Sequence, residues 1–219
     1  MVIVNENKKR SFEKRDELIE VAMVEFGEKG YENASLNNIL KEAGISKGTF
    51  YYHYKNKEDL YMHLMDIITE EKLMYISKRI GSIDFNEDVF TILSELIKIG
   101  MKFAYNNPKI NKFTQSFVKD WGTPIHNEIL RRYYIDRADY LNNITKKYGF
   151  ESMDYISDLM EKAYDKGEIR EDLPKKFVIK LINHLFLNLP QIVNASNLDE
   201  YELAANYLID FIRDGLSKD

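Results

Sequence analysis

Apolar residues recur along this chain at the three- and four-residue spacing of amphipathic helices. The first such segment covers residues 13–30, and its apolar face consists of Ile19, Ala22, Met23 and Phe26. No segment keeps the strict alternation that is typical of a half-buried strand. Helix breakers are also scarce, with Gly 10 and Pro 4 among 219 residues. The pattern therefore predicts an all-α protein.

The second and third predicted helices are separated by a very short turn. Ser35 and Ser46 are suitable N-caps for these helices, and Gly44 ends the first of the two. Two helices joined in this way form a helix-turn-helix. The third helix runs only to about Tyr54, which is too short for a helix that is stable by itself. We therefore expect Phe50 to anchor it in the core.

Longer amphipathic segments fill the rest of the chain. A fourth helix is expected to run from its N-cap, Asn56, to about residue 80. The further predicted helices cover residues 87–106, 109–120, 124–148, 151–166, 174–194 and 198–216. We place a small helix-turn-helix domain at 1–60 and a larger helical domain at 61–219. Because the fourth helix is shared by both domains, no flexible linker is expected between them.

Charge is unevenly distributed along the chain. The formal net charge is −5, yet residues 8–15 carry five basic residues against one glutamate, a net of +4. Residues 41–57 carry four lysines against one glutamate, a net of +3. Basic patches of this kind favour an anionic partner, above all nucleic acid, although a solvated surface would give the same pattern.

The segment 46–57 combines this positive charge with the predicted helix-turn-helix. The second helix of such a motif enters the major groove with its N-terminal residues nearest the base edges. Gly48 allows the backbone to approach the duplex closely, and Lys47 and Thr49 can reach bases or phosphates. Lys57 lies beside the exposed amides at the start of the next helix, where a phosphate site is expected.

The aromatic rings of this segment divide between core and surface. Phe50 and Tyr54 are spaced to be buried, whereas Tyr51, Tyr52 and His53 are expected to point outward. Hydroxyl and imidazole groups can form hydrogen bonds with phosphates or bases, and their rings can contact sugars and thymine methyl groups. The alternative is that Tyr51 extends the buried stripe, because positions 50, 51 and 54 also form a plausible core face.

Residues 19–65 resemble the DNA-binding domain of the TetR family of transcriptional regulators. The positions that match the family pattern are Phe26, Gly30, Tyr31, Ser35, Ile39, Ala43, Gly44, Gly48, Tyr51, Tyr54, Lys57 and Leu60. Leu40 departs from the pattern, since alanine is usual there, and Tyr54 often appears as phenylalanine. The resemblance implies binding to duplex operator DNA.

The resemblance also implies roles for individual residues. The implied base contacts are Asn37, Lys47, Gly48, Thr49, Tyr51 and His53. The implied phosphate contacts are Ser35, Tyr52 and Lys57. The arm before the first helix, with Lys8, Lys9 and Arg10, is a further candidate for contact with the DNA backbone or the minor groove.

Family members dimerise through their last two helices, so a homodimer is implied for this chain as well. The candidate interface residues are Leu181, Leu185, Leu189, Leu208 and Phe211. The alternative is that these side chains face the core of the subunit. A two-fold dimer would read a pseudo-palindromic operator with half-sites about 34–36 Å apart.

Most family members also bind a small effector in the C-terminal domain. Apolar and aromatic side chains that could line such a pocket are Met101, Phe103, Tyr105, Phe117, Trp121, His126 and Tyr134. Aromatic residues at helical spacing are also typical of an ordinary core. We therefore expect a homodimeric repressor released by a small, largely apolar effector, with a protein-interaction module that binds no small molecule as the alternative for the C-terminal domain.

Several other classes of protein are disfavoured. Cysteine is absent, and the four histidines show no metal-ligand spacing, so we expect neither a metal site nor a cofactor. The sequence contains no nucleophile elbow and no phosphate-binding loop, so we expect no catalytic residues. No stretch approaches eighteen uninterrupted apolar residues and no secretory signal is evident, which favours a cytoplasmic protein that does not enter a membrane.

Overall fold

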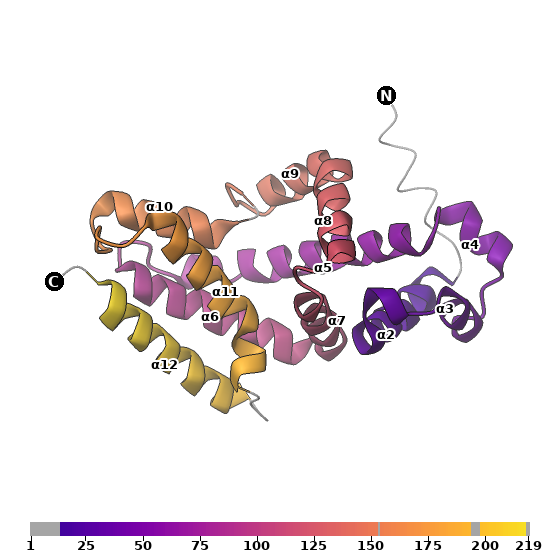
Figure 1. Ribbon diagram of the computed structural model, residues 1–219, viewed down its shortest axis with the longest axis horizontal. Coiled ribbons are helices and arrows are strands. Elements are labelled where there is room, and N and C mark those ends of the chain that lie inside the picture. The colour runs from indigo at the N-terminus through magenta and orange to yellow at the C-terminus, as the bar shows by residue number, and fades with distance from the viewer. Residues whose placement is uncertain (1–13, 153, 194–197, 218–219) are drawn as a thin grey trace. The chain divides into compact units, whose positions relative to one another are not determined.

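The computed structural model of the chain describes residues 14–152, 154–193 and 198–217. For Leu187, residues 189–193, Leu198 and Tyr201 it describes the backbone alone. Regular structure in the described part is helical, apart from one isolated antiparallel bridge between Ile169 and Ser217 (Figure 1). The predicted all-α class is confirmed. None of the described helices is long and apolar enough to span a bilayer.

The helices form two compact units. The first unit comprises residues up to Thr69 together with Asn107–Asp136. It contains α2 (Arg15–Asn33), α3 (Leu36–Glu42), α4 (Lys47–His53), the first part of α5 (Lys57–Ser77), α7 (Pro108–Lys119) and α8 (Pro124–Asp136). The compact unit that holds the predicted helix-turn-helix thus also includes two helices from much later in the chain.

The second unit comprises Glu70–Asn106 and Arg137–Asp219. It contains the rest of α5, the short η2 (Ile80–Ser82), α6 (Val89–Asn106), α9 (Ala138–Lys147), α10 (Tyr155–Lys166), α11 (Lys175–Val193) and α12 (Leu198–Leu216). The division into functional domains at 1–60 and 61–219 concerns activity rather than compactness, and it stays a prediction.

The helix-turn-helix forms where the capping residues predict it. The Ser35 hydroxyl accepts a hydrogen bond from Asn38 N at 3.3 Å, and the Ser46 hydroxyl accepts one from Thr49 N at 3.0 Å. Each of these bonds satisfies an amide that would otherwise have no partner at a helix start. Gly44 sits in the turn between α3 and α4 with φ of +64°, which is strained for other residues.

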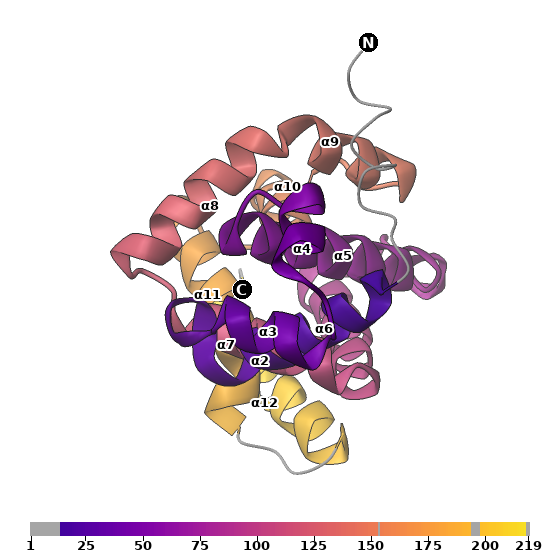
Figure 2. The ribbon, with the colours of Figure 1, turned by 90° about the vertical axis from the view of Figure 1, so that its right-hand side faces the viewer.

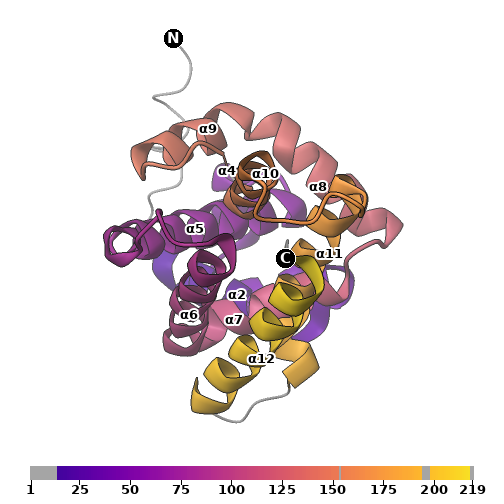
Figure 3. The same cartoon turned by 90° about the vertical axis from the view of Figure 1, so that its left-hand side faces the viewer.

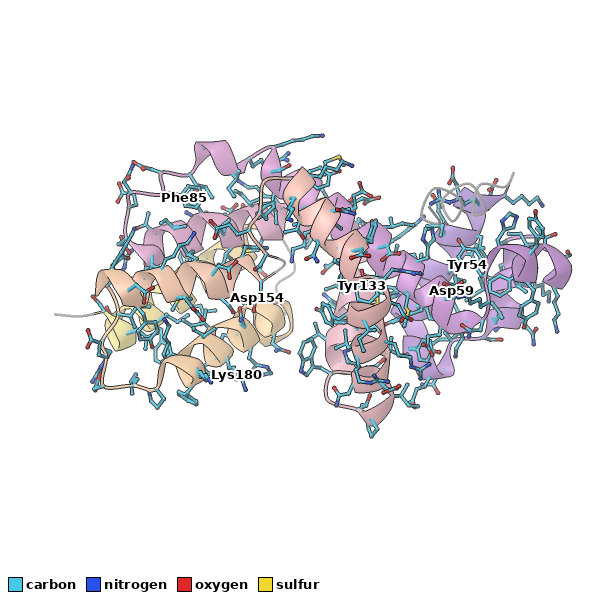
Figure 4. The ribbon with its side chains drawn as sticks, turned by 90° about the horizontal axis from the view of Figure 1, so that it is seen from above. Tyr54, Asp59, Phe85, Tyr133, Asp154 and Lys180 are labelled. Carbon is cyan, nitrogen blue, oxygen red and sulfur yellow. The ribbon has the colours of Figure 1, made fainter. Side chains whose placement is uncertain are left out.

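The short α4 is held by the burial of two rings. Phe50 is 0% exposed and stacks at 5.4 Å on Tyr54, which is also buried, as predicted. Figure 4 labels Tyr54 beside Asp59, the residue that accepts a hydrogen bond from Lys55 N at 3.1 Å. The path from α4 into α5 is therefore fixed both by the packing of the rings and by a hydrogen bond from a backbone amide to the Asp59 carboxylate.

Helix α2 packs closely along α7 within the first unit. A Cβ atom at Gly27 would lie only 3.1 Å from Phe113 N, so glycine allows the two backbones to approach. The Phe113 ring also contacts Phe26 and Tyr61, with centroid distances of 6.4 and 5.0 Å. Ion pairs join the same helices at their surface, with Lys109 against Glu20 at 2.9 Å. The helix-turn-helix and α7 therefore form one packed body.

The core of the second unit lies among α6, α10, α11 and α12. Helix α12 runs alongside α6 (Figures 1 and 3), and these two helices share the most extensive packing in this unit. The buried side chains are Val89, Phe90, Leu93, Ile97, Met160, Ala163, Ile169, Val178, Ile182, Ala205, Ile209, Ile212 and Leu216. At the start of α6, Val89 N donates a hydrogen bond to the Glu168 carboxylate at 2.7 Å, which ties α6 to the segment after α10.

One predicted helix is wrong in its extent. The segment 124–148 forms two helices, α8 and α9, with a break at Arg137, whose φ of −110° and ψ of 8° are not helical. Neither Gly nor Pro marks this break, and local propensity favours a continuous helix. The cause is tertiary, because α8 packs in the first unit whereas α9 binds α5 in the second. There Lys147 and Tyr148 both donate hydrogen bonds to Glu70, at 2.7 and 3.2 Å.

Candidate nucleic-acid interface

Helix α4 presents an exposed aromatic and polar edge. Figure 2 shows α3 and α4 at the end of the first unit that faces the viewer. Tyr51 is 57% exposed and Tyr52 is 72% exposed, while His53 is partly buried. The alternative that Tyr51 belongs to the buried stripe is therefore wrong. The Tyr51 ring meets the buried Phe50 ring edge to face at 5.2 Å, yet both tyrosines keep the exposed surface that an element reading a groove requires.

The exposed edge of α4 is ordered by contacts among its own side chains. The Ser46 and Thr49 hydroxyls lie 2.9 Å apart, so Thr49 is already oriented at the helix start. The Tyr52 and His53 rings meet edge to face at 4.9 Å. Burial lowers the pKa of His53, which favours the neutral imidazole in the free protein. The neutral ring offers one hydrogen-bond donor and one acceptor.

The other predicted contacts on α3 and α4 also reach solvent. Asn37, Lys47, Gly48 and Thr49 are exposed. Ser35 is partly exposed, and its amide donates a hydrogen bond to Glu25 at 2.9 Å. The Ser35 oxygen already accepts the capping bond, so its hydroxyl proton is the group that could serve a phosphate. Lys8, Lys9 and Arg10 lie outside the described residues.

Lys57 is predicted to contact a phosphate, but its ammonium already has other partners in the structure. Its ammonium donates hydrogen bonds to three backbone carbonyl oxygens, those of Tyr31 at 2.7 Å, Ala34 at 3.1 Å and Glu32 at 3.2 Å. An ammonium has three donors. A phosphate contact would therefore require Lys57 to give up at least one of these bonds, a competition that the sequence pattern does not reveal.

The predicted effector residues divide between the two compact units. Met101, Phe103 and Tyr105 belong to the second unit, where Met101 packs against the core, Phe103 is buried beside Tyr75 and Tyr105 is exposed. The remaining four, Phe117, Trp121, His126 and Tyr134, belong to the first unit. The seven residues thus include ordinary core positions, which was the alternative interpretation for any one of them.

Three of the predicted residues do form a ring cluster at the turn between α7 and α8. His126 lies 4.4 Å from Phe117 and 5.6 Å from Trp121, measured between ring centroids. His126 is 5% exposed, and its buried Nε2 atom has no hydrogen-bond partner among the described residues. Burial lowers the pKa of His126, although the nearby Asp120 carboxylate opposes this effect. Tyr134 is exposed and is not part of this cluster.

A concave region of about 250 Å³ lies in the second unit at the start of α6. Its apolar lining comes from Phe85, Val89, Ile92, Leu159 and Ala163, and its polar edge from Lys162, Lys166 and Glu168. Figure 4 labels Phe85 at this end of the unit. None of the seven predicted effector residues lines this region. Both lysines at its edge are paired with glutamates, with Lys162 3.0 Å from Glu151 and Lys166 3.7 Å from Glu168.

Helices α11 and α12 carry an exposed apolar face. Of the predicted interface residues, Leu181 is 41% exposed and Phe211 is 76% exposed. Leu185 and Leu208 instead pack against the core of the second unit, as the alternative interpretation anticipated, and the Leu189 side chain lies outside the described part. Sequence reasoning missed three side chains that are each more than half exposed, Phe177, Leu203 and Tyr207.

Two of the missed residues lie four positions from residues that were found. Phe177 precedes Leu181 by four residues, and Tyr207 precedes Phe211 by four, so the helical spacing contained the signal. We call Phe177, Leu181, Leu203, Tyr207 and Phe211 the α11–α12 apolar face. Exposed apolar side chains grouped at this spacing are typical of an interaction surface.

The geometry agrees with what comparisons with known proteins show. The profile of bacterial regulatory proteins of the tetR family matches residues 18–64, which contain the whole helix-turn-helix. The HTH-type negative transcriptional regulator IcaR of the Staphylococcus epidermidis biofilm operon icaADBC is 25% identical over 143 residues. That alignment covers 59% of this chain and 77% of IcaR.

Solved structures extend the likeness to nearly the whole chain. A TetR family transcriptional regulator from Chloroflexus aurantiacus superposes with a TM-score of 0.68 at 23% identity, covering 94% of each chain. FadR from Bacillus subtilis, solved in complex with stearoyl-CoA, gives a TM-score of 0.62 at 18% identity and covers 91% of this chain and 98% of its own. At these identities the likeness shows the fold. The match over α2 to α5 shows that residues 18–64 form a helix-turn-helix domain of the TetR family, and the chain as a whole is similar to transcriptional regulators that are DNA-binding proteins rather than enzymes.

Proposed function

We propose that this regulator is a homodimeric repressor that binds a pseudo-palindromic operator through α3 and α4. The observation that carries the proposal is the exposed edge of α4, where Tyr51 and Tyr52 project to solvent over a buried Phe50. The proposed base contacts are Asn37, Lys47, Gly48, Thr49, Tyr51 and His53. The proposed phosphate contacts are Ser35 and Tyr52. The relative IcaR is a negative transcriptional regulator, which supports repression.

The α11–α12 apolar face supports the homodimer. One α4 reaches only a few base pairs, whereas a two-fold dimer doubles both base and phosphate contacts. Three of the five residues of the α11–α12 apolar face are aromatic, and aromatic side chains often dominate the energy of protein interfaces. A second copy of the chain is the occupant that a two-fold operator requires. In a bacterium the operator lies in the cytoplasm, which is where we place the protein.

The proposed effector is a small, largely apolar molecule bound by residues 61–219. Support comes from the structural neighbour FadR, which was solved with stearoyl-CoA. In this chain the Phe117, Trp121 and His126 cluster offers aromatic surface and one buried nitrogen without a partner. An effector can release the protein from DNA only if it binds more tightly to the conformation that does not fit the operator. A coupling of about 1–3 kcal/mol is the usual scale of such effects.

A second candidate keeps DNA binding but replaces the effector with a protein partner. One observation that favours it is the division of the predicted pocket residues between the two units. A second is that the concave region of about 250 Å³ at the start of α6 is bordered by lysines already paired with glutamates. Stearoyl-CoA is a suitable probe for separating the two candidates. Release of DNA by low concentrations of stearoyl-CoA or of a related acyl thioester would favour the effector.

Gel-shift and fluorescence titrations against fragmented genomic DNA test the proposed function. We expect a small set of fragments to bind far more tightly than a random-sequence duplex, typically by a factor of about 10³ or more. Affinity should fall steeply as salt increases, because phosphate contacts release counterions. Equal affinity for all fragments, or binding that is insensitive to salt, would contradict operator recognition.

A further inference from the structure

We propose that Lys57 is a positioning residue for the helix-turn-helix. It supports DNA binding by joining the two ends of segment 34–57 through hydrogen bonds rather than by contacting a phosphate. The proposal rests on the DNA-binding function above. It departs from the role that the family resemblance implies for this lysine, which is a phosphate contact.

The geometry of the Lys57 ammonium carries the first step. It lies within hydrogen-bonding distance of the carbonyl oxygens of Tyr31, Glu32 and Ala34, at 2.7, 3.2 and 3.1 Å. Two of these carbonyls belong to the last turn of α2, which follows the non-helical Gly30, and the third belongs to the residue after the helix. Carbonyls at a helix end lack intrahelical partners. Lys57 therefore satisfies three acceptors at once and uses all three of its own donors.

The surroundings make this position specific for a lysine. The ammonium also lies 4.6 Å from the centroid of the Tyr31 ring, a cation–π contact. Tyr31 in turn meets the Phe26 and Tyr61 rings at 6.2 and 5.0 Å, so the ring beneath the ammonium is itself held by the core. Burial lowers the pKa of Lys57, which reflects the partial removal of the ammonium from water.

The position of Lys57 in the chain explains what the contact would do. Lys57 is the first residue of α5, and Ala34 immediately precedes Ser35, the N-cap of α3. The Lys57–Ala34 hydrogen bond therefore joins the two ends of a segment that contains both α3 and α4. Helix α4 has only seven residues and depends on its neighbours for its place.

Both ends of this closed segment are fixed by further contacts. On the α2 side, Ser35 N donates to Glu25 at 2.9 Å, and Glu25 also accepts from Lys29 at 2.8 Å. On the α5 side, Glu58 pairs with Arg132 of α8 at 2.9 Å. Lys57 connects the two sides by hydrogen bonds, in addition to the ring contacts of Phe26 and Tyr31 with Tyr61. Without it, the start of α3 could shift relative to α5, and the reading edge of α4 would shift with it.

The test compares Lys57→Met with Lys47→Met, which removes the same charge from an exposed position on α4. Loss of hydrogen bonds made by a charged group should lower the Tm of Lys57→Met by about 4–8 °C, while Lys47→Met should leave it nearly unchanged. Hydrogen exchange should rise for amides of residues 36–53 in Lys57→Met but not for those of α10 or α12.

DNA binding gives the decisive readout, measured at a temperature where each variant is fully folded. For the tightest genomic fragment, Lys57→Met should lose about tenfold in affinity at every salt concentration. The slope of log K against log salt should stay that of the wild type, because no phosphate contact is lost. A lost phosphate contact would instead reduce the slope by about 0.9.

Three results would overturn the proposal. The first is a slope reduced by about 0.9 together with an unchanged Tm, which would make Lys57 a phosphate contact. The second is a lower Tm with unchanged affinity of the folded protein, which would leave Lys57 a purely structural residue. The third is an unchanged Tm, affinity and slope.

Lys57→Arg keeps the test informative if Lys57→Met fails to fold. Arginine preserves the charge, but its planar fork cannot direct three donors at carbonyls that converge on one point. We expect a lowered Tm and weakened DNA binding with a wild-type slope, and full wild-type behaviour would overturn the proposal. If the wild type itself shows no preference among DNA fragments, the proposed function fails, whereas the Tm and hydrogen-exchange comparison still tests whether Lys57 holds segment 34–57.

Discussion

At the scale of single residues, Phe50 and Tyr51 are neighbours with opposite tasks. Phe50 is fully buried under α4, whereas Tyr51 is largely exposed and touches Phe50 edge to face at 5.2 Å. Phe50→Ala should destabilise the protein by about 3–5 kcal/mol, because it opens a cavity in the core. Tyr51→Ala should leave the free energy of unfolding nearly unchanged but weaken operator binding by about 1–3 kcal/mol.

Urea unfolding and DNA titration of both variants check this pair. The telling comparison is the ratio of affinities for the best genomic fragment and for a random duplex. Tyr51→Ala should reduce that ratio while the protein stays folded. A variant that lost equal affinity for both duplexes would show that Tyr51 does not read bases.

Glu25 makes a residue-scale contribution that depends on pH. Burial is the largest single influence and would raise its pKa, but hydrogen bonds from Lys29 and from Ser35 N together outweigh it. The pKa of Glu25 in the folded protein therefore lies below its ordinary value of 4.5. A lowered folded-state pKa gives stability that is present above the unfolded-state value and is lost as pH falls through the folded-state value.

Glu25→Gln should therefore destabilise the protein at pH 7. The difference in Tm from wild type should shrink as pH falls below about 4, because protonated glutamate and glutamine are both neutral. Thermal unfolding from pH 7 to the acid limit measures it. A difference that stays constant with pH would show that the Glu25 charge makes no contribution to stability.

At the scale of elements, sequence reasoning succeeded where local chemistry decides the outcome. The N-caps Ser35 and Ser46, the turn at Gly44 and the buried Phe50 all follow from side-chain chemistry within a few residues. It failed at Arg137, where a break between α8 and α9 is imposed by packing in two different units. The candidate site shows the same contrast between local and tertiary causes. The exposed edge of α4 is local and was predictable from helical spacing.

Lys57 shows what helical spacing does not reveal. Its position in the family pattern is correct, but the carbonyls that receive its ammonium lie 23 to 26 residues earlier in the chain. The candidate effector residues stay a prediction for a related reason. A shared aromatic character does not specify which unit each ring joins, and the seven candidates divide between two. Contacts over long sequence separations are set by the tertiary structure, so local spacing in the sequence does not predict them.

The close approach of α2 and α7 gives an element-scale prediction. Alanine is favoured over glycine within a helix by about 1 kcal/mol, yet a Cβ at Gly27 would meet the α7 backbone at 3.1 Å. Gly27→Ala should therefore lower the Tm despite its better helix propensity. Gly100→Ala in α6 is the matched control, because a Cβ there meets nothing within 4 Å and should leave the Tm equal or raised.

Thermal unfolding measures the change in Tm, which should be negative for Gly27→Ala and zero or positive for Gly100→Ala. If Gly27→Ala were as stable as Gly100→Ala, α7 would be able to move away from α2 at little cost. The result bears on regulation as well, because α7 shares a packed body with the helix-turn-helix. A displacement of α7 by a bound effector would be passed directly to α2 and thus to the reading helices.

At the scale of the whole molecule, the proposed function requires two copies that hold their α4 helices at the spacing of successive major grooves, about 34–36 Å. The described chain offers the α11–α12 apolar face for this assembly, with Phe211 as its most exposed large side chain. Its ring has little to contact within the subunit, so its value would lie in the dimer. Aromatic residues at the centre of an interface commonly contribute more than 2 kcal/mol.

Phe211→Asp should therefore convert the protein to a monomer at concentrations where the wild type is a dimer, because a carboxylate would be buried against apolar side chains. Phe85→Asp is the control, since Phe85 is also an exposed phenylalanine of the second unit but precedes α6 and belongs to neither α11 nor α12. Sedimentation gives the mass of each variant, and circular dichroism confirms that each subunit is folded. DNA affinity should fall with the dimer, since a single α4 loses the contacts of the second half-site. A dimeric Phe211→Asp, or equal dissociation of both variants, would place the two-fold contact elsewhere on the chain.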